Sequence, residues 1–111
     1  MEKIHVPLGE DAAGILACPK CAGEFLHHSQ VTIRNRQVED APGFSTTVTQ
    51  EGVNRQPIST GFRGRRSDLE VTLECEDCEG VFRLVIMQYK GWTLLWTEAA
   101  RPESSSNFDG R

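Results

Sequence analysis

The fold is decided by residues 68–97, which read DLEVTLECEDCEGVFRLVIMQYKGWTLLWT. The first part of this stretch, residues 68–75, alternates strictly between polar and apolar side chains, which is the period of a half-buried strand. The side chains predicted to face the core are those of Leu69, Val71, Leu73 and Cys75. The acidic and polar side chains between them are expected to face water.

Two further strands follow in the same stretch. Residues 81–89 are rich in β-branched and other apolar side chains, which is typical of a central strand. Lys90-Gly91 predicts a tight turn, because glycine takes a positive φ without steric cost. Residues 92–97 then return, with both tryptophans on one face. Together the three segments predict an antiparallel meander.

Two pairs of cysteines share the pattern Cys-x-x-Cys-x-Gly, one at residues 18–23 and one at residues 75–80. Two intervening residues let both sulfurs of a pair turn toward one point, so two pairs supply four thiolates at about 2.3 Å from a tetrahedral ion. Gly23 and Gly80 are expected to take a positive φ that curls backbone N–H groups toward the sulfurs. The pattern predicts a structural Zn²⁺ site. The predicted ligands are Cys18, Cys21, Cys75 and Cys78.

Other roles for the four cysteines fit the sequence less well. Two disulfides need an oxidising compartment, and a thioredoxin-like dithiol needs a single pair in a βαβ context. A rubredoxin-like iron site has the same four thiolates, but here the pairs are far apart in the chain and no compact aromatic shell accompanies them. A catalytic zinc is not expected, because four cysteine ligands leave no position for water.

The three histidines, His5, His27 and His28, do not form a recognisable catalytic set. Adjacent residues of a strand point to opposite faces, so only one of His27 and His28 can face any site. The insert between the cysteine pairs contains no histidine after His28, so the arrangement of an HNH-type nuclease is missing. We expect partly exposed strand histidines and no enzyme activity.

The remaining segments before residue 68 are assigned from their composition. Residues 25–37 predict one strand or two, and the β-branched residues of 43–49 predict another. Residues 50–67 lack periodicity and are predicted to be a flexible loop. Residues 9–14 fit a single helical turn.

This reading predicts a single zinc-bound β domain over residues 1–101. The insert between the two cysteine pairs spans residues 22–74. Residues 102–111 contain few apolar side chains and are predicted to be a disordered tail.

The two cysteine-containing segments, each followed by a strand, resemble the knuckles of the zinc-ribbon group. Residues 73–93 are also similar to small zinc-ribbon proteins of phages and mobile elements. The resemblance implies a mainly β fold with an antiparallel zinc-ribbon-like sheet, a long insert between the knuckles, and a role in transcription, replication or protein assembly. The alternative is the β-tent of Yippee-like proteins, in which two Cys-x-x-Cys pairs pin sheets together.

Charge is distributed unevenly along the chain. The net charge is −4, yet residues 31–67 contain six arginines against three acidic residues, and residues 68–111 contain nine acidic residues against four basic ones. Glycine, an aromatic ring and guanidinium groups meet in residues 61–66, GFRGRR. This composition suits docking on an acidic protein groove, contact with phosphates and bases, or a merely solvated loop. The predicted partner-binding residues are Phe62, Arg63, Arg65 and Arg66.

Composition and charge exclude several classes of protein. With 38% hydrophobic and 25% charged residues the chain of 111 residues is globular, and no apolar run approaches the roughly 18 residues of a membrane-spanning helix. The N-terminal residues lack the apolar stretch of a secretory signal, so we expect a cytoplasmic protein, in the host cell if phage-encoded. The sequence favours a non-enzymatic regulator or adaptor that acts through protein–protein interaction, with host transcription or replication machinery as the expected partner. The alternative is a nucleic-acid-binding zinc-ribbon protein that uses the arginine-rich insert.

Overall fold

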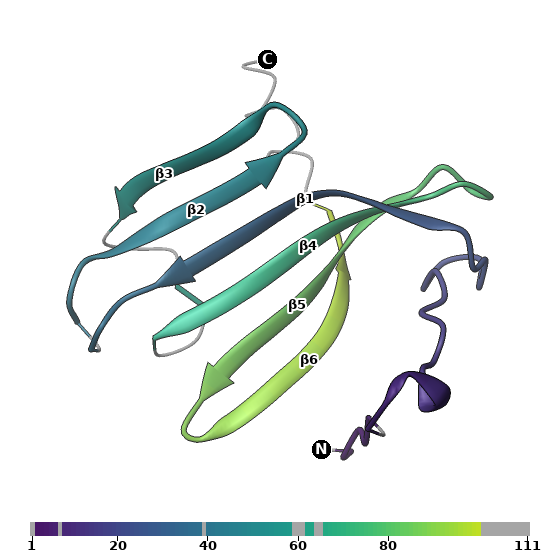
Figure 1. Cartoon of the computed structure of the whole chain (residues 1–111), viewed down its shortest axis with the longest axis horizontal. Coiled ribbons are helices and arrows are strands. Elements are labelled where there is room, and N and C mark those ends of the chain that lie inside the picture. Colours follow the sequence, from purple (N-terminus) through teal and green to yellow (C-terminus); the bar gives the residue numbers. More distant parts are fainter. Residues whose placement is uncertain (1, 7, 39, 59–61, 64–65, 101–111) are drawn as a thin grey trace.

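The computed structural model describes residues 2–6, 8–38, 40–58, 62–63 and 66–100, in which six antiparallel strands form one open sheet (Figure 1). The strands are β1 (Leu26–Asn35), β2 (Gly43–Thr49), β3 (Gly52–Ile58), β4 (Ser67–Cys75), β5 (Val81–Tyr89) and β6 (Trp92–Ala99). A single turn of 3₁₀ helix, η1 (Glu10–Ala12), precedes them. The predictions of a mainly β fold and of one helical turn near residue 10 are confirmed. The predicted tail, residues 102–111, lies outside the described residues.

The order of strands in the sheet is β3-β2-β1-β4-β5-β6. Each half of the sheet is therefore a meander of consecutive strands, and the two halves meet where β1 pairs with β4. That pairing runs from Leu26 opposite Cys75 to Asn35 opposite Ser67, with a register shift between His28 and Gln30. All six described strands belong to one sheet, so the alternative of separate sheets pinned together is not observed among them.

The predicted meander after residue 68 is present as β4, β5 and β6. The turn at Lys90 and Gly91 has φ values of 52° and 85°, which is the pair of positive values that a two-residue hairpin turn needs. The register of β5 and β6 places Val85 opposite Trp96 and Tyr89 opposite Trp92, so both tryptophans share a face as predicted.

Residues 50–67 are not a continuous loop, and this prediction is wrong for the segment that forms β3. β3 pairs with β2 over its whole length, from Gly52 opposite Thr49 to Ile58 opposite Gly43. All side chains of β3 before Ile58 are exposed. An edge strand whose side chains are exposed on both faces needs no alternation of apolar residues. Pro57 is tolerated because an edge strand forms hydrogen bonds to a neighbouring strand on only one side.

The two faces of the sheet differ mainly in charge. Cross-strand partners share a face, so the side chains in register with Leu69, Val71 and Leu73 form what we call the apolar face. Its other apolar strand residues are Leu26, Val31, Ile33, Phe44, Val48, Val53, Pro57, Phe82, Leu84, Ile86, Leu95 and Ala99. The opposite, charged face carries Asp68 and Glu70 of β4, and toward β6 it also carries the aromatic rings of Tyr89, Trp92 and Trp96.

Burial reverses the expectation for the first half of β4. Asp68 and Glu70 are only 2% and 6% exposed, whereas Leu69 and Val71 are half-buried. The predicted inward face is correct only toward the end of the strand, where Leu73 is buried beside the cysteines. Alternation identifies two unlike faces, but the packing of other segments decides which of them is covered.

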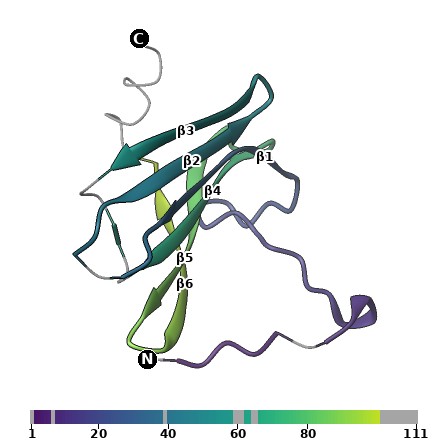
Figure 2. The same ribbon diagram turned by 60° about the vertical axis from the view of Figure 1, so that its left-hand side comes forward.

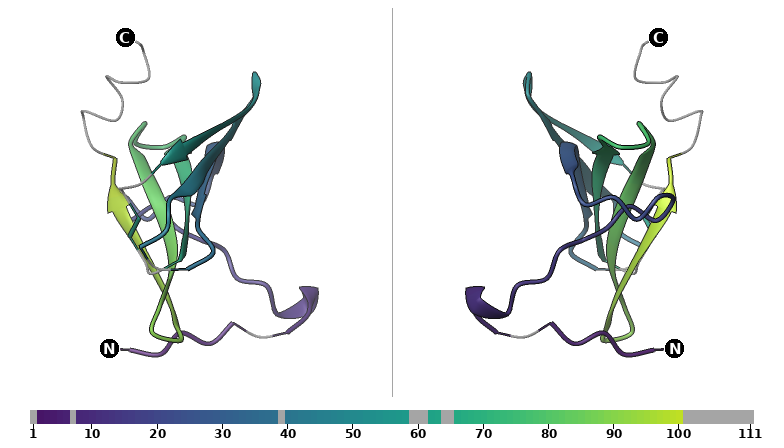
Figure 3. Two further views of the ribbon diagram at one scale, coloured as in Figure 1. Left: turned by 90° about the vertical axis from the view of Figure 1, so that its left-hand side faces the viewer. Right: turned by 90° about the vertical axis from the view of Figure 1, so that its right-hand side faces the viewer.

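The residues before the first knuckle lie apart from the sheet. We call residues 2–6 and 8–17 the N-terminal arm; every side chain that the structure describes in it is exposed. Figure 2 shows this arm extending away from the strands, and Figure 3 shows from two opposite sides how strongly the sheet twists between β3 and β6. No helix in the described ranges has the length and apolar character needed to cross a membrane.

Candidate metal centre

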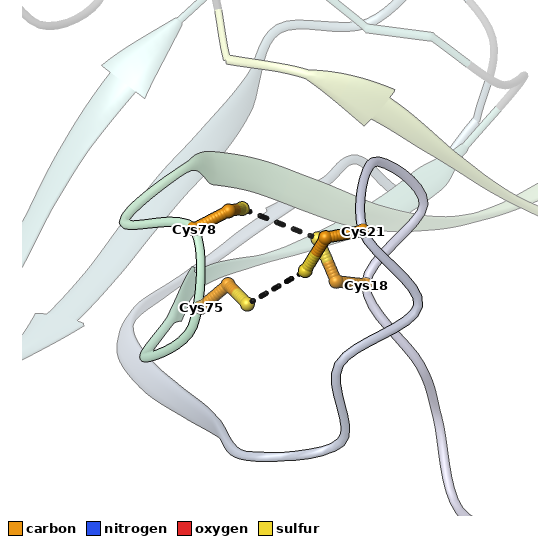
Figure 4. Close-up of side chains that lie close together, drawn as sticks. All are labelled: Cys18, Cys21, Cys75 and Cys78. Carbon is orange, nitrogen blue, oxygen red and sulfur yellow. Dashed lines mark hydrogen bonds between the residues drawn. The ribbon is translucent and has the colours of Figure 1, made fainter.

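The four cysteines converge at one end of the β1–β4 pair (Figure 4). Cys18 and Cys21 lie just before β1, Cys75 is the last residue of β4, and Cys78 lies in the turn that leads to β5. Their sulfurs are all within 4.8 Å of one another. The Cys18 and Cys78 sulfurs are 3.8 Å apart, and those of Cys21 and Cys75 are 3.6 Å apart.

These distances fit a single metal ion. Four sulfurs at about 2.3 Å from a tetrahedral centre lie about 3.8 Å from one another. A disulfide needs sulfurs at about 2.05 Å, and all four cysteines are free. The predicted ligand set is therefore brought together in space, and its four thiolates form a donor set that suits zinc or iron.

The two knuckles have the same backbone structure, which explains their shared sequence pattern. In each knuckle, the backbone N–H of the first cysteine donates to the carbonyl of the glycine. The backbone N–H of the residue that precedes the glycine donates to the carbonyl of the first cysteine. These bonds measure 2.8 and 2.9 Å in the first knuckle, and 3.0 and 2.9 Å in the second. Each knuckle is thus a closed turn that holds its two sulfurs on one side.

The glycines of the knuckles have a different role from the predicted one. The positive φ values belong to the preceding residues, Ala22 at 65° and Glu79 at 59°. A Cβ atom on Gly23 would collide with the carboxylate of Asp77, and a Cβ on Gly80 would lie 3.2 Å from the sulfur of Cys78. Glycine is needed here because a side chain would crowd the sulfurs.

Backbone N–H groups do approach the sulfurs, as predicted, in the first knuckle. The Lys20 N–H donates to the Cys18 sulfur and the Gly23 N–H to the Cys21 sulfur, each at 3.4 Å. Such bonds stabilise thiolate ligands by partly neutralising their charge.

The sulfurs compete for negative charge. Hydrogen bonding from the backbone of Cys21, assisted by Lys20 and by neighbouring sulfurs, outweighs burial and lowers the pKa of Cys18 to about 7. The Gly23 N–H favours the thiolate of Cys21, but the sulfur of Cys75, burial and the other two sulfurs outweigh it and raise the pKa of Cys21 to about 12. A cation at the centre removes this competition, because it favours ionisation of all four thiols.

The metal centre is continuous with the small core. Cys18 and Cys75 are 3% and 2% exposed and pack with Leu73 and Phe82 on the apolar face. Cys21 and Cys78 are exposed. A metal at this position therefore fixes both the knuckles and the end of the sheet that they cover.

The histidines lie outside the cysteine cluster. His27 and His28 are exposed residues of β1, and His5 is exposed in the N-terminal arm. The ring of His27 lies 2.6 Å from a carboxylate oxygen of Glu76, which joins β1 to the second knuckle. This contact braces the knuckle from its exposed side.

The structure describes three of the four predicted partner-binding residues. Phe62 is half-buried, with the guanidinium of Arg36 4.3 Å from its ring centre. Arg63 is bound to carboxylates of the charged face. Arg66 is exposed, and Arg65 lies outside the described residues. Partner binding by this segment stays a prediction.

Sequence reasoning missed the role of Arg63, which belongs to an ionic cluster on the charged face. We define the cluster as Arg34, Arg63, Arg83, Asp68, Glu70 and Glu98, which contains three positive and three negative side chains. The backbone N–H of Arg63 also donates to Asp68 at 2.9 Å. The cluster ties residues 62–63 to the sheet and explains why its carboxylates are covered.

Glu70 is the centre of the ionic cluster. Its carboxylate accepts from Arg34 Nη1 and Arg63 Nε at 2.8 Å each, and from Arg83 Nη1 at 3.5 Å. Burial opposes ionisation of Glu70, but the hydrogen bonds and charges of Arg63 and Arg34 prevail and lower its pKa. Glu98 likewise has a lowered pKa, because hydrogen bonds from Trp96 and Arg63 outweigh its burial.

Comparison with known proteins identifies no relative of this chain. The link to zinc ribbons rests on the two knuckles alone, whose four cysteines converge as that resemblance implies. No family model, no curated protein and no solved structure matches this chain.

Proposed function

We propose that this protein is a non-enzymatic structural-zinc module that acts as an adaptor or regulator by binding another protein. The observation that carries the proposal is the convergence of four cysteine sulfurs within 4.8 Å, packed against the buried part of the apolar face. Zinc is favoured over iron because a site that only fixes geometry needs no redox chemistry, and zinc has none.

A structural role follows from the number of ligands. Four thiolates complete a tetrahedral zinc and leave no position at which water or substrate binds. His27, which follows the first knuckle, is exposed and is paired with Glu76. The ion then contributes by holding two distant segments together.

Protein binding is favoured over nucleic-acid binding because part of the positive charge of the insert is neutralised within the chain. Arg34 and Arg63 are ion-paired to buried carboxylates. The guanidiniums of Arg36 and Arg55 lie over the rings of Phe62 and Phe44. The two ion-paired arginines therefore present less field to a phosphate backbone than the composition suggests, whereas the two that lie over rings keep their charge.

The metal part of the proposal is tested by elemental analysis of protein purified without added metal. We expect about one zinc per chain, and Cys21→Ser should lose most of it because three thiolates bind zinc more weakly than four. His27→Ala is the matched control near the same site and should keep its zinc. A folded chain without metal, or with iron in place of zinc, would contradict this part.

The partner part is tested by a mobility-shift titration with generic DNA and RNA at two salt concentrations. We expect no binding at about 150 mM salt, because a net charge of −4 opposes association with phosphates. Tight binding that weakens steeply with salt, and weakens further in Arg66→Ala, would replace the adaptor with a nucleic-acid-binding protein.

A further inference from the structure

Much of the apolar face of the sheet is open to water. On the charged face, Arg63 lies against Asp68 and Glu70, and these two carboxylates are almost fully buried. In the described part of the chain, no second layer covers the apolar face beyond the knuckles. Domains ordinarily bury an apolar sheet face against a second layer.

The side chains of the apolar face become more exposed with distance from the cysteine cluster. Leu73 and Phe82, beside the cysteines, are 4% and 3% exposed. Farther along the strands, Ile33 and Leu95 are 38% and 37% exposed, and Val48 is 41% exposed. The covered core and the open surface are therefore one continuous apolar stripe.

This open surface is almost free of charge. Among its strand residues only Arg55 carries a formal charge, although charged residues make up 25% of the chain. Arg55 lies on the edge strand β3, with its guanidinium 3.6 Å from the ring centre of Phe44. No acidic side chain of the six strands lies on this face. Depletion of charge at a patch centre is typical of protein interfaces.

The chain exposes more surface than a compact monomer of its size. A compact monomer of 12.4 kDa exposes about 6,100 Å², whereas this chain exposes 8161 Å². The half-exposed side chains of the apolar face contribute to that excess, and so does the N-terminal arm, whose described side chains are all exposed. A standard interface buries about 800 Å² on each partner, which is well below the excess.

We propose that the apolar face is the interface with a second copy of this chain. Two copies related by a two-fold axis present the same surface to each other, so apolar side chains meet apolar side chains and no opposite charge is required. The two sheets then pack face to face about 10 Å apart, as the layers of a β-sandwich do. Arg55 lies toward one edge of the sheet, where the rim of such an interface is polar. This inference does not depend on the metal's identity or on the partner of the proposed function.

The proposal is tested by sedimentation velocity of the metal-loaded full chain over a range from about 1 to about 100 μM, which brackets the Kd of a moderate interface. We expect the mass of two chains at the highest concentration and reversible dissociation on dilution. Ile33→Lys and Leu95→Lys each place a charge on the apolar face, and each should weaken the dimer at least about tenfold.

Two matched controls carry the same substitution elsewhere. Val81→Lys alters an exposed residue on the charged face, and Leu8→Lys alters an exposed residue of the N-terminal arm. Both should leave the dimer unchanged. A single-chain mass for the parent protein at about 100 μM overturns the proposal, whatever the variants do. A dimer that survives Leu95→Lys but dissociates with Leu8→Lys also overturns it, because the arm would then be the interface.

Discussion

Replacing Glu70 by glutamine removes the charge at the centre of the ionic cluster while keeping nearly the same side-chain volume. The Glu70 side chain is 7% exposed and receives hydrogen bonds from three guanidiniums. Removing one partner of a buried ion pair costs about 3–5 kcal/mol. Arg34 keeps Asp68 and Arg63 keeps Glu98, so we expect the lower end of that range, about 3 kcal/mol.

Urea unfolding of the metal-loaded protein at pH 7 measures this loss. For a small protein, stability falls by about 1–3 kcal/mol per molar urea, so Glu70→Gln should lower the midpoint by about 1 M or more. Glu74→Gln is the matched control, since Glu74 is exposed on the same strand, and its stability should change by less than about 0.5 kcal/mol. Equal midpoints for Glu70→Gln and the parent would refute a stabilising role for the ionic cluster.

The pH dependence of stability gives a second measure of the stabilisation by Glu70. Folding lowers the pKa of Glu70 below its ordinary value of 4.5, so its stabilisation is present above pH 4.5 and is lost as pH falls through the lowered pKa. The difference in unfolding free energy between the parent and Glu70→Gln should therefore narrow below pH 4.5. The comparison is made only at pH values at which both chains still hold their metal, which elemental analysis of each sample checks.

Two further predictions concern the metal centre. A strong chelator should abolish the β-sheet circular dichroism, because structural zinc contributes about 10–16 kcal/mol and a small domain is stable by only about 5–15 kcal/mol; an unchanged spectrum of the verified metal-free chain would contradict this. Gly23→Ala should weaken metal binding roughly tenfold in competition with a chromophoric chelator, because the new Cβ meets Asp77 and lies 3.2 Å from the Cys21 sulfur. Gly14→Ala, with nothing within 4 Å of its Cβ, should bind metal as the parent does.

The cysteine cluster and the last three strands were predictable because their signals are local. A Cys-x-x-Cys pair directs its two sulfurs to one point. Two such pairs form a four-sulfur site once the fold brings them together. In the same way, the turn at Lys90 and Gly91 together with the apolar residues that flank it predicts the hairpin of β5 and β6 without reference to the rest of the chain.

The strand β3 and the burial of Asp68 and Glu70 were not predictable from the same patterns. β3 is formed by hydrogen bonds to β2, and its exposed side chains carry no apolar period. The two carboxylates are buried because arginines from β1, β5 and the segment before β4 converge on them. That convergence depends on the pairing of β1 with β4, which no short stretch of sequence contains.

The pairing of β1 with β4 also determines how the chain finds its fold. It begins at Leu26 opposite Cys75, beside the cysteine cluster, and the neighbouring sulfurs of Cys21 and Cys75 belong to residues that are 54 positions apart in the chain. Closing a loop of that length costs about 3.5 kcal/mol in chain entropy, apart from a constant. Every other strand pair joins sequence neighbours, so we expect the formation of this one long-range pair to limit the folding rate. If a metal ion binds the unfolded chain first, it brings the two knuckles together. The pairing of β1 with β4 can then begin at the knuckles and extend along the strands. The speed of folding is then governed by the free metal concentration.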